Sequence, residues 1–146
     1  MHGPLWENPR MERPSPLARY LLAAYTLLIV DGSLYPFAGW RDQGVGALAF
    51  LFAPLPRYVT AFDIAANLFA YAPLGFLAVL VLWPWLRASR AVAVASLCAS
   101  ALSFTLEALQ TYLPSRFASN LDLAANANGA LLGALLGAVV AGPLMR

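Results

Sequence analysis

Four long apolar runs, at about 17–37, 62–85, 91–113 and 121–141, alternate with short polar segments along the chain. Each run has roughly the twenty residues that an α-helix needs to cross the ~30 Å hydrocarbon core of a bilayer. Pro73 and Gly75 interrupt the second run, which a membrane helix tolerates as a kink when neighbours bond the freed carbonyl. The pattern predicts an all-α, polytopic transmembrane bundle of four helices.

Two segments fall outside these runs. Residues 1–16 are polar and proline-rich, which predicts a disordered cytoplasmic tail ahead of a membrane domain at 17–146. The arginines before the first run also resemble a signal peptide, but no small-x-small cleavage site follows, which favours an uncleaved span. Residues 45–52 are apolar but too short to cross, and they predict a short interfacial helix in the first external loop.

Composition supports a bilayer as the solvent and narrows the classes of partner. Of the 146 residues, 61% are hydrophobic and 11% are charged, against about a quarter charged in a soluble domain. The net charge of +2 forms no basic stripe, so membrane lipids are the expected partner and nucleic acid is not. His2 and Cys98 are alone of their kind, which excludes an internal disulfide, a His/Cys zinc site and a Ser-His-Asp triad. No metal and no cofactor are expected.

Residues 57–67 and 116–126 are near copies of each other, and each leads into an apolar run. Both read Arg, aromatic, apolar, Ser or Thr, two more residues, Asp, Ile or Leu, Ala, Ala, Asn. Each predicts a helix start capped by a hydroxyl and an acid, Thr60-x-x-Asp63 in one copy and Ser119-x-x-Asp122 in the other. The copies therefore predict two hairpin repeats, related by a pseudo-two-fold axis along the membrane normal.

The arginines near the helix ends predict the orientation in the membrane. Six lie on the side of the termini and three on the other, which favours cytoplasmic termini in a bacterial inner membrane and outward-facing copies. The six are Arg10, Arg13, Arg19, Arg87, Arg90 and Arg146, and the three are Arg41, Arg57 and Arg116.

The copies also place polar side chains inside the apolar slab. Asn67 and Asn126 each follow an aspartate by four residues, so they lie on the same helix face about 6 Å deeper. An amide at that depth needs a partner, which can be another helix or a ligand. The aspartates themselves have two interpretations, as helix caps or as ligand-binding groups.

Glu107 is the candidate for chemistry. It lies about 24 Å along its helix, roughly 6 Å below the outer edge of the slab, on one face with Ser103 and Gln110. A carboxylate there costs on the order of 2–3 kcal/mol to insert, which indicates a function unless an arginine is its buried partner. The predicted site has Glu107 as its catalytic candidate, and its ligand-binding residues are Arg57, Asp63, Asn67, Gln110, Arg116, Asp122 and Asn126.

The fourth run carries Gly129, Gly133 and Gly137 at four-residue spacing. Small residues on one stripe let two helices approach closely in lipid. The stripe predicts a packing face, and we consider it as a surface through which copies of the chain form a homo-oligomer.

Several of these motifs together resemble the VanZ-like family of small bacterial membrane proteins. The motifs are Asp63-x-x-x-Asn67, Pro73-Leu74-Gly75, residues 103–110, Pro114-Ser115-Arg116 and Asp122-x-x-x-Asn126-x-x-Gly129. The resemblance covers about residues 60–137. The name-giving member of that family is associated with resistance to the glycopeptide teicoplanin, so the resemblance implies an envelope-related membrane protein with a role in glycopeptide resistance.

Three functions are open at this point. The first is binding of an anionic lipid-linked envelope intermediate or a glycopeptide-related ligand, with Arg57 and Arg116 at the rim. The second is an intramembrane enzyme that uses Glu107 as acid or base on a lipid-linked substrate. The third is a small carrier whose two hairpins rock around the polar site.

Overall fold

The computed structural model describes residues 15–56, 58–83, 85–86 and 89–144. Most of the predicted tail and Arg57 lie outside these residues. The described chain forms α1 (Pro16–Leu34), α2 (Ala61–Leu82), α3 (Ser89–Gln110) and α4 (Asn120–Leu144), with a 3-10 helix, η1 (Ala49–Phe52), in the first loop. No strand occurs in this part of the chain, which confirms the all-α prediction.

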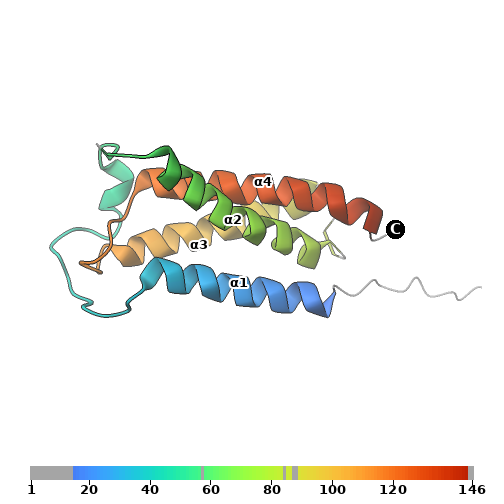
Figure 1. Cartoon of the computed structure of the whole chain (residues 1–146), viewed down its shortest axis with the longest axis horizontal. Coiled ribbons are helices and arrows are strands. Elements are labelled where there is room, and N and C mark those ends of the chain that lie inside the picture. Colours follow the sequence, from blue (N-terminus) through green and yellow to red (C-terminus); the bar gives the residue numbers. More distant parts are fainter. Residues whose placement is uncertain (1–14, 57, 84, 87–88, 145–146) are drawn as a thin grey trace, which may run out of the picture.

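The four helices run up and down along one axis (Figure 1). α1 begins and α4 ends at one end of the bundle, while η1 and the starts of α2 and α4 lie at the other end. We call this second end the loop end. The predicted runs at 17–37 and 91–113 extend about three residues past α1 and α3. Each helix stops shortly before a proline, Pro36 or Pro114, whose nitrogen has no hydrogen to donate to the helix.

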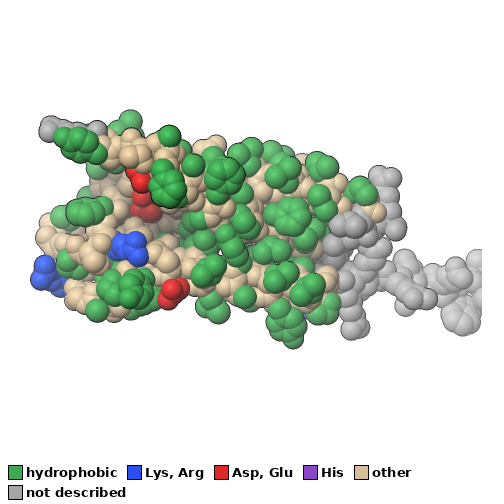
Figure 2. Space-filling model, in the orientation of Figure 1, with side chains coloured by type: hydrophobic (Ala, Val, Ile, Leu, Met, Phe, Trp, Pro, Cys, Tyr) green, Lys and Arg blue, Asp and Glu red, His purple; other side chains and the backbone are tan. Residues whose placement is uncertain are grey.

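The surface of the helices suits hydrocarbon. All four are long and apolar enough to cross a membrane, and each leaves most of its residues uncovered by the rest of the chain. Large apolar side chains such as Leu97 and Val139 stand exposed along the bundle. In Figure 2 the helical surface is mainly hydrophobic, and the charged side chains on this face gather toward the loop end. Lipid is the solvent that makes such a surface stable.

Helices α2 and α4 make the most extensive contact in the bundle, and glycine makes it possible. A β-carbon on any of three central glycines would collide with backbone of the facing helix. The pairs are Gly129 with Leu68, Gly133 with Ala72, and Gly75 of α2 with Ala130 of α4. The stripe is thus a packing face between α2 and α4 of the same chain. An oligomer contact through Gly129, Gly133 and Gly137 stays a prediction.

The parallel packing of α2 against α4 sets the site. In the contacts given above, the α4 residue follows its α2 partner by about as many positions as separate the two sequence copies. The starts of the two helices therefore stand side by side at the loop end. Pro73 is accommodated within a continuous α2. The carbonyl that loses its helical donor at Pro73 is that of Phe69, four residues earlier. The neighbouring Ala70 carbonyl accepts a hydrogen bond from the Tyr25 hydroxyl of α1 at 2.9 Å, which links α1 to α2.

The first loop folds back over the loop end. Phe50 of η1 is buried, and its ring lies 6.0 Å from that of Phe104 in α3, at an interplanar angle of 53°. The predicted helix at 45–52 is thus a single short turn held by one aromatic anchor. Gln43 fixes the same loop, since its Nε2 donates to the Thr111 carbonyl at 2.7 Å.

Candidate ligand-binding site

A cavity of about 580 Å³ lies toward the loop end, between α1 and the other three helices. All four helices and the loop before α4 contribute to its wall. Six of the eight predicted site residues line it: Asn67, Glu107, Gln110, Arg116, Asp122 and Asn126. Asp63 lines a neighbouring hollow of about 330 Å³, which shares Asn67 and Asp122 with the cavity. Arg57 lies outside the described residues.

In the first sequence copy, the acid is used to start its own helix. Thr60 and Asp63 form a complete capping box at the start of α2. The Asp63 N–H donates to Thr60 Oγ1 at 3.1 Å, and the Thr60 N–H donates back to Asp63 Oδ2 at 2.9 Å. The Thr60 hydroxyl adds a third bond to the same carboxylate oxygen at 2.8 Å. Asp63 is exposed, and capping explains its geometry.

In the second copy, an acid from another helix replaces Asp122 as the acceptor of the N-cap backbone N–H. Ser119 Oγ accepts the N–H groups of Leu121 and Asp122 at 3.2 and 3.3 Å, as a capping hydroxyl does. The Ser119 N–H, however, donates to Glu107 Oε2 of α3 at 2.7 Å, and not to Asp122. Glu107 is 4% exposed. Its carboxylate therefore holds the start of α4, at the positive end of that helix dipole.

Because Glu107 accepts the Ser119 N–H, the Asp122 carboxylate is left on the wall between the cavity and the neighbouring hollow. Within the described residues no hydrogen bond is made to its oxygens, and Asp122 lines both the cavity and the neighbouring hollow. In Asp63, by contrast, Oδ2 accepts two hydrogen bonds from Thr60. Two acids that look the same in the sequence thus have different surroundings.

One turn deeper, Asn126 is buried at 4% exposure. Its Nδ2 donates to Ser103 Oγ of α3 at 2.9 Å, so it does link two helices. Its Oδ1 is buried without a hydrogen-bond partner among the described atoms. A buried carbonyl oxygen in this state is unfavourable unless something else bonds it. Asn67, its copy in α2, is half-buried on the wall of both hollows.

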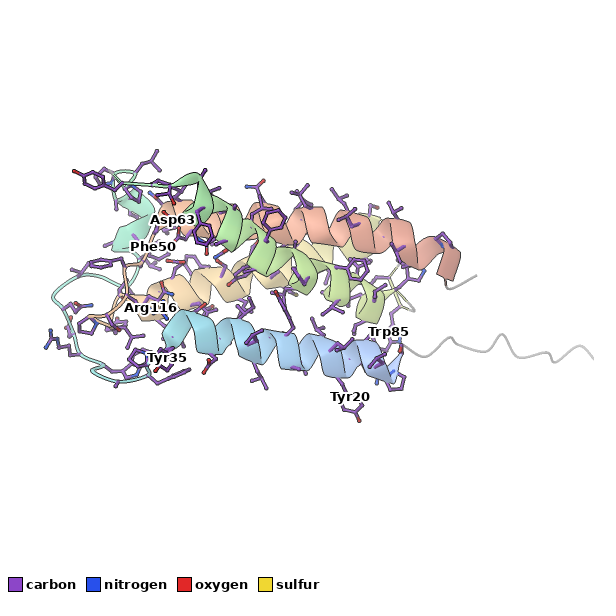
Figure 3. The ribbon with its side chains drawn as sticks, in the orientation of Figure 1. Tyr20, Tyr35, Phe50, Asp63, Trp85 and Arg116 are labelled. Atoms are coloured by element: carbon purple, nitrogen blue, oxygen red, sulfur yellow. The ribbon has the colours of Figure 1, made fainter. Side chains whose placement is uncertain are left out.

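Arg116 and Gln110 attach α1 to the rest of the bundle. The Arg116 side chain donates from Nε to the Tyr35 carbonyl at 3.0 Å and from NH2 to the Gly32 carbonyl at 2.7 Å. Gln110 Nε2 donates to the Ser33 carbonyl at 2.9 Å. Figure 3 shows Arg116 and Tyr35 close together at the loop end. A cation is favourable here because the last turn of a helix carries unbonded carbonyls and the negative end of its dipole.

Comparison with known proteins identifies the family of the chain. A model of the VanZ/LLP1 family matches residues 15–141, which is nearly the whole described chain. The chain belongs to the VanZ/LLP1 family. The match confirms the resemblance seen in the sequence motifs, and it extends through α1 and the first loop, which carry no sharp motif. No curated protein and no solved structure matches the chain.

The wall of this VanZ/LLP1 protein carries more negative than positive charge. Its described residues include two carboxylates, Glu107 and Asp122, and one guanidinium, Arg116. Among the described residues no three acidic, His or Cys side chains are grouped so that they could hold a metal ion. The chemistry available at the cavity is hydrogen bonding and charge.

Sequence reasoning left two participants out of the predicted site. Ser103 bonds Asn126, and Ser119 joins Glu107 to the start of α4. Ser103 stands one turn before Glu107 on the same helix face, which was a usable signal. The bond between Ser119 and Glu107 had no comparable signal, because it joins a backbone group to a side chain of another helix.

Proposed function

We propose that this multi-pass VanZ/LLP1 membrane protein binds the polar head of an amphiphilic envelope component in the cavity, with the loop end facing outward. The head belongs to a lipid-linked intermediate or a glycopeptide-related molecule. One observation carries the proposal: polar groups of all four helices, including buried Glu107 and Asn126, converge on one cavity within an apolar bundle. Burying such groups in a membrane costs free energy, and hydrogen bonds to a polar ligand offset that cost.

The shape and composition of the cavity suit an amphiphile. Its wall combines the polar residues with apolar ones such as Leu28, Ile29 and Leu106. Arg116 uses two of its five N–H donors on carbonyls at the end of α1. Its remaining N–H groups suit an anionic group such as a phosphate at the rim. A role in glycopeptide resistance would follow if the bound component is one that the antibiotic or its target requires.

An acid or base role for Glu107 on a lipid-linked substrate is the second candidate. It is favoured by the position of Glu107, which is buried yet lines the cavity beside Asp122. The bond from Ser119 to Glu107 favours a positioning role instead. We therefore rank binding first.

A cavity-filling variant tests the proposal directly. Ser33 lies on the last turn of α1, is partly exposed and lines the cavity. We expect the purified wild-type protein and Ser33→Ala to retain a bacterial envelope lipid, identified by mass spectrometry of the extract, and Ser33→Trp to lose it. Equal retention by Ser33→Trp, at an unchanged thermal unfolding midpoint, refutes binding in this cavity.

The two sequence copies provide a second, matched test. Asp122→Asn changes an acid on the cavity wall, and Asp63→Asn changes its copy in the capping box. We expect Asp122→Asn to lower ligand retention and any teicoplanin phenotype with little effect on stability. Asp63→Asn keeps an oxygen acceptor for Thr60 but loses the charge near the start of α2, so it should lower the stability slightly and leave retention intact. The same outcome for both variants contradicts the assignment of different roles.

A further inference from the structure

We infer that the group seated in the cavity of this protein is a hydrogen-bond donor of the ligand, an amine or the hydroxyls of a sugar or polyol, and not its phosphate. This inference rests on the proposed function and specifies the chemistry of the ligand. The evidence is the set of hydrogen-bond donors and acceptors on the cavity wall that already bond other groups of the protein.

Several donors on the wall already bond the protein itself. Gln110 uses one of its two Nε2 hydrogens on the Ser33 carbonyl, and Asn126 uses one of its two Nδ2 hydrogens on Ser103. Arg116 directs Nε and NH2 at the carbonyls of Tyr35 and Gly32. A phosphate needs several donors, preferably charged ones, converging on it. Apart from the remaining N–H groups of Arg116, the donors left on the described wall are neutral amides and hydroxyls, those of Gln110, Asn126, Asn67, Ser33, Ser115 and Tyr71.

The acceptors are mostly left over. Asn126 Oδ1 is buried without a partner. The side-chain amide oxygens of Gln110 and Asn126 accept no hydrogen bond from the described residues, although both side chains line the cavity. Asp122 receives no hydrogen bond from the described residues, and Glu107 has a second oxygen besides the one bonded by Ser119. The wall is thus a concentration of acceptor oxygens that only incoming N–H or O–H groups can satisfy.

The balance of charge points the same way. Two acidic side chains but only one basic side chain line the cavity, so a further anion placed among them gains no net attraction from the described residues. An ammonium group or neutral hydroxyls avoid that disadvantage. An amphiphile with both a phosphate and a donor group fits with its phosphate toward Arg116 and its donor group against Asp122 and Asn126.

Two matched pairs of lipids with identical acyl chains test the inference on the whole protein in a nonionic detergent. Phosphatidylethanolamine and phosphatidylcholine are both zwitterions, but only the first has N–H donors. Phosphatidylglycerol and phosphatidylmethanol are both anions, but only the first has free hydroxyls. Native mass spectrometry of the lipid-bound protein gives the relative dissociation constants.

We expect the donor-bearing member of at least one pair to bind at least about tenfold more tightly, because one hydrogen bond to a charged acceptor is worth that much. A preference in the first pair identifies an amine, and one in the second pair identifies hydroxyls. Asn126→Leu should reduce the preference. Asn128→Leu should not, because Asn128 is exposed and bonds only its own helix at the Ala124 carbonyl.

Two results overturn the inference in different ways. If all four lipids bind equally well and Ser33→Trp abolishes their binding, the cavity holds a lipid but does not select for hydrogen-bond donors. In that case this inference fails and the proposed function stands. If Ser33→Trp leaves the binding of every lipid unchanged, the cavity is not the binding site and both proposals fail. Loss of folding in Asn126→Leu does not affect the test, because the comparison of lipids on the wild-type protein decides it.

Discussion

Replacing Glu107 by leucine should weaken the start of α4 more than it disturbs α3. The side chain has a similar size, but it cannot accept the Ser119 N–H, which donates to Glu107 at 2.7 Å. A buried N–H left without a partner costs about 1–3 kcal/mol, and loss of a negative charge at a helix N-terminus costs about 0.3–1 kcal/mol. Removing a buried charge offsets part of this sum. We expect a net loss of about 1–3 kcal/mol in the free energy of unfolding.

Glu107→Gln separates the two contributions. Glutamine keeps an oxygen acceptor for Ser119 and loses only the charge, so its cost should stay below about 1 kcal/mol. Equilibrium unfolding in mixed micelles of SDS and a mild detergent, followed by tryptophan fluorescence, measures both variants. Hydrogen exchange adds a local readout, since the amide of Ser119 should exchange faster in Glu107→Leu and nearly as in wild type in Glu107→Gln.

Thr105→Val is the matched control. Thr105 is exposed on the same helix, and its hydroxyl bonds only the Ala101 carbonyl of its own helix. If Glu107→Leu unfolds at the same SDS fraction as Thr105→Val, with no faster exchange at Ser119, then Glu107 does not hold α4. The acid or base role would become the better explanation for a buried carboxylate at that position.

Two further predictions concern packing and topology. Gly133→Ala should lower stability by about 1–3 kcal/mol, because its β-carbon collides with backbone of α2. Gly142→Ala should be tolerated in the same thermal unfolding assay, because its β-carbon would meet only the Trp83 ring, at an ordinary contact distance of 4.0 Å. Single cysteines replacing Tyr58 and Phe117, in a chain whose exposed Cys98 is changed to alanine, should both react with a membrane-impermeant maleimide added to intact cells. Labelling of only one of the two, or of either only after lysis, contradicts a shared outward face.

The helices were predictable because lipid imposes a simple requirement. A span must be long, apolar and internally hydrogen-bonded, so the lengths of the runs placed all four helices within a few residues. The spacing of the acids and amides along each helix was predictable for the same reason, since the rise of a helix is fixed. Six of the predicted residues line one cavity, although their role in binding stays a prediction.

The different roles of the aspartates in the two sequence copies could not be predicted. Thr60-x-x-Asp63 and Ser119-x-x-Asp122 have the same local pattern, yet a glutamate from a third helix displaces one acid and not the other. Likewise, nothing near Arg116 in the sequence indicates that its partners are carbonyls of α1, because main-chain groups are the same at every residue. The glycine stripe indicated close packing, but only the arrangement of the helices shows that α2 is its partner.

The attachment of α1 through its main chain has a practical consequence for labelling. Arg116 and Gln110 bond the carbonyls of Gly32, Ser33 and Tyr35, so the side chains at those positions can be exchanged while the anchoring oxygens stay in place. An environment-sensitive fluorophore attached at position 35, which is exposed and does not line the cavity, would lie beside the cavity without filling it and without detaching the helix. The molecule therefore offers a ready position for an optical sensor that reports, in real time, when the hollow fills and empties.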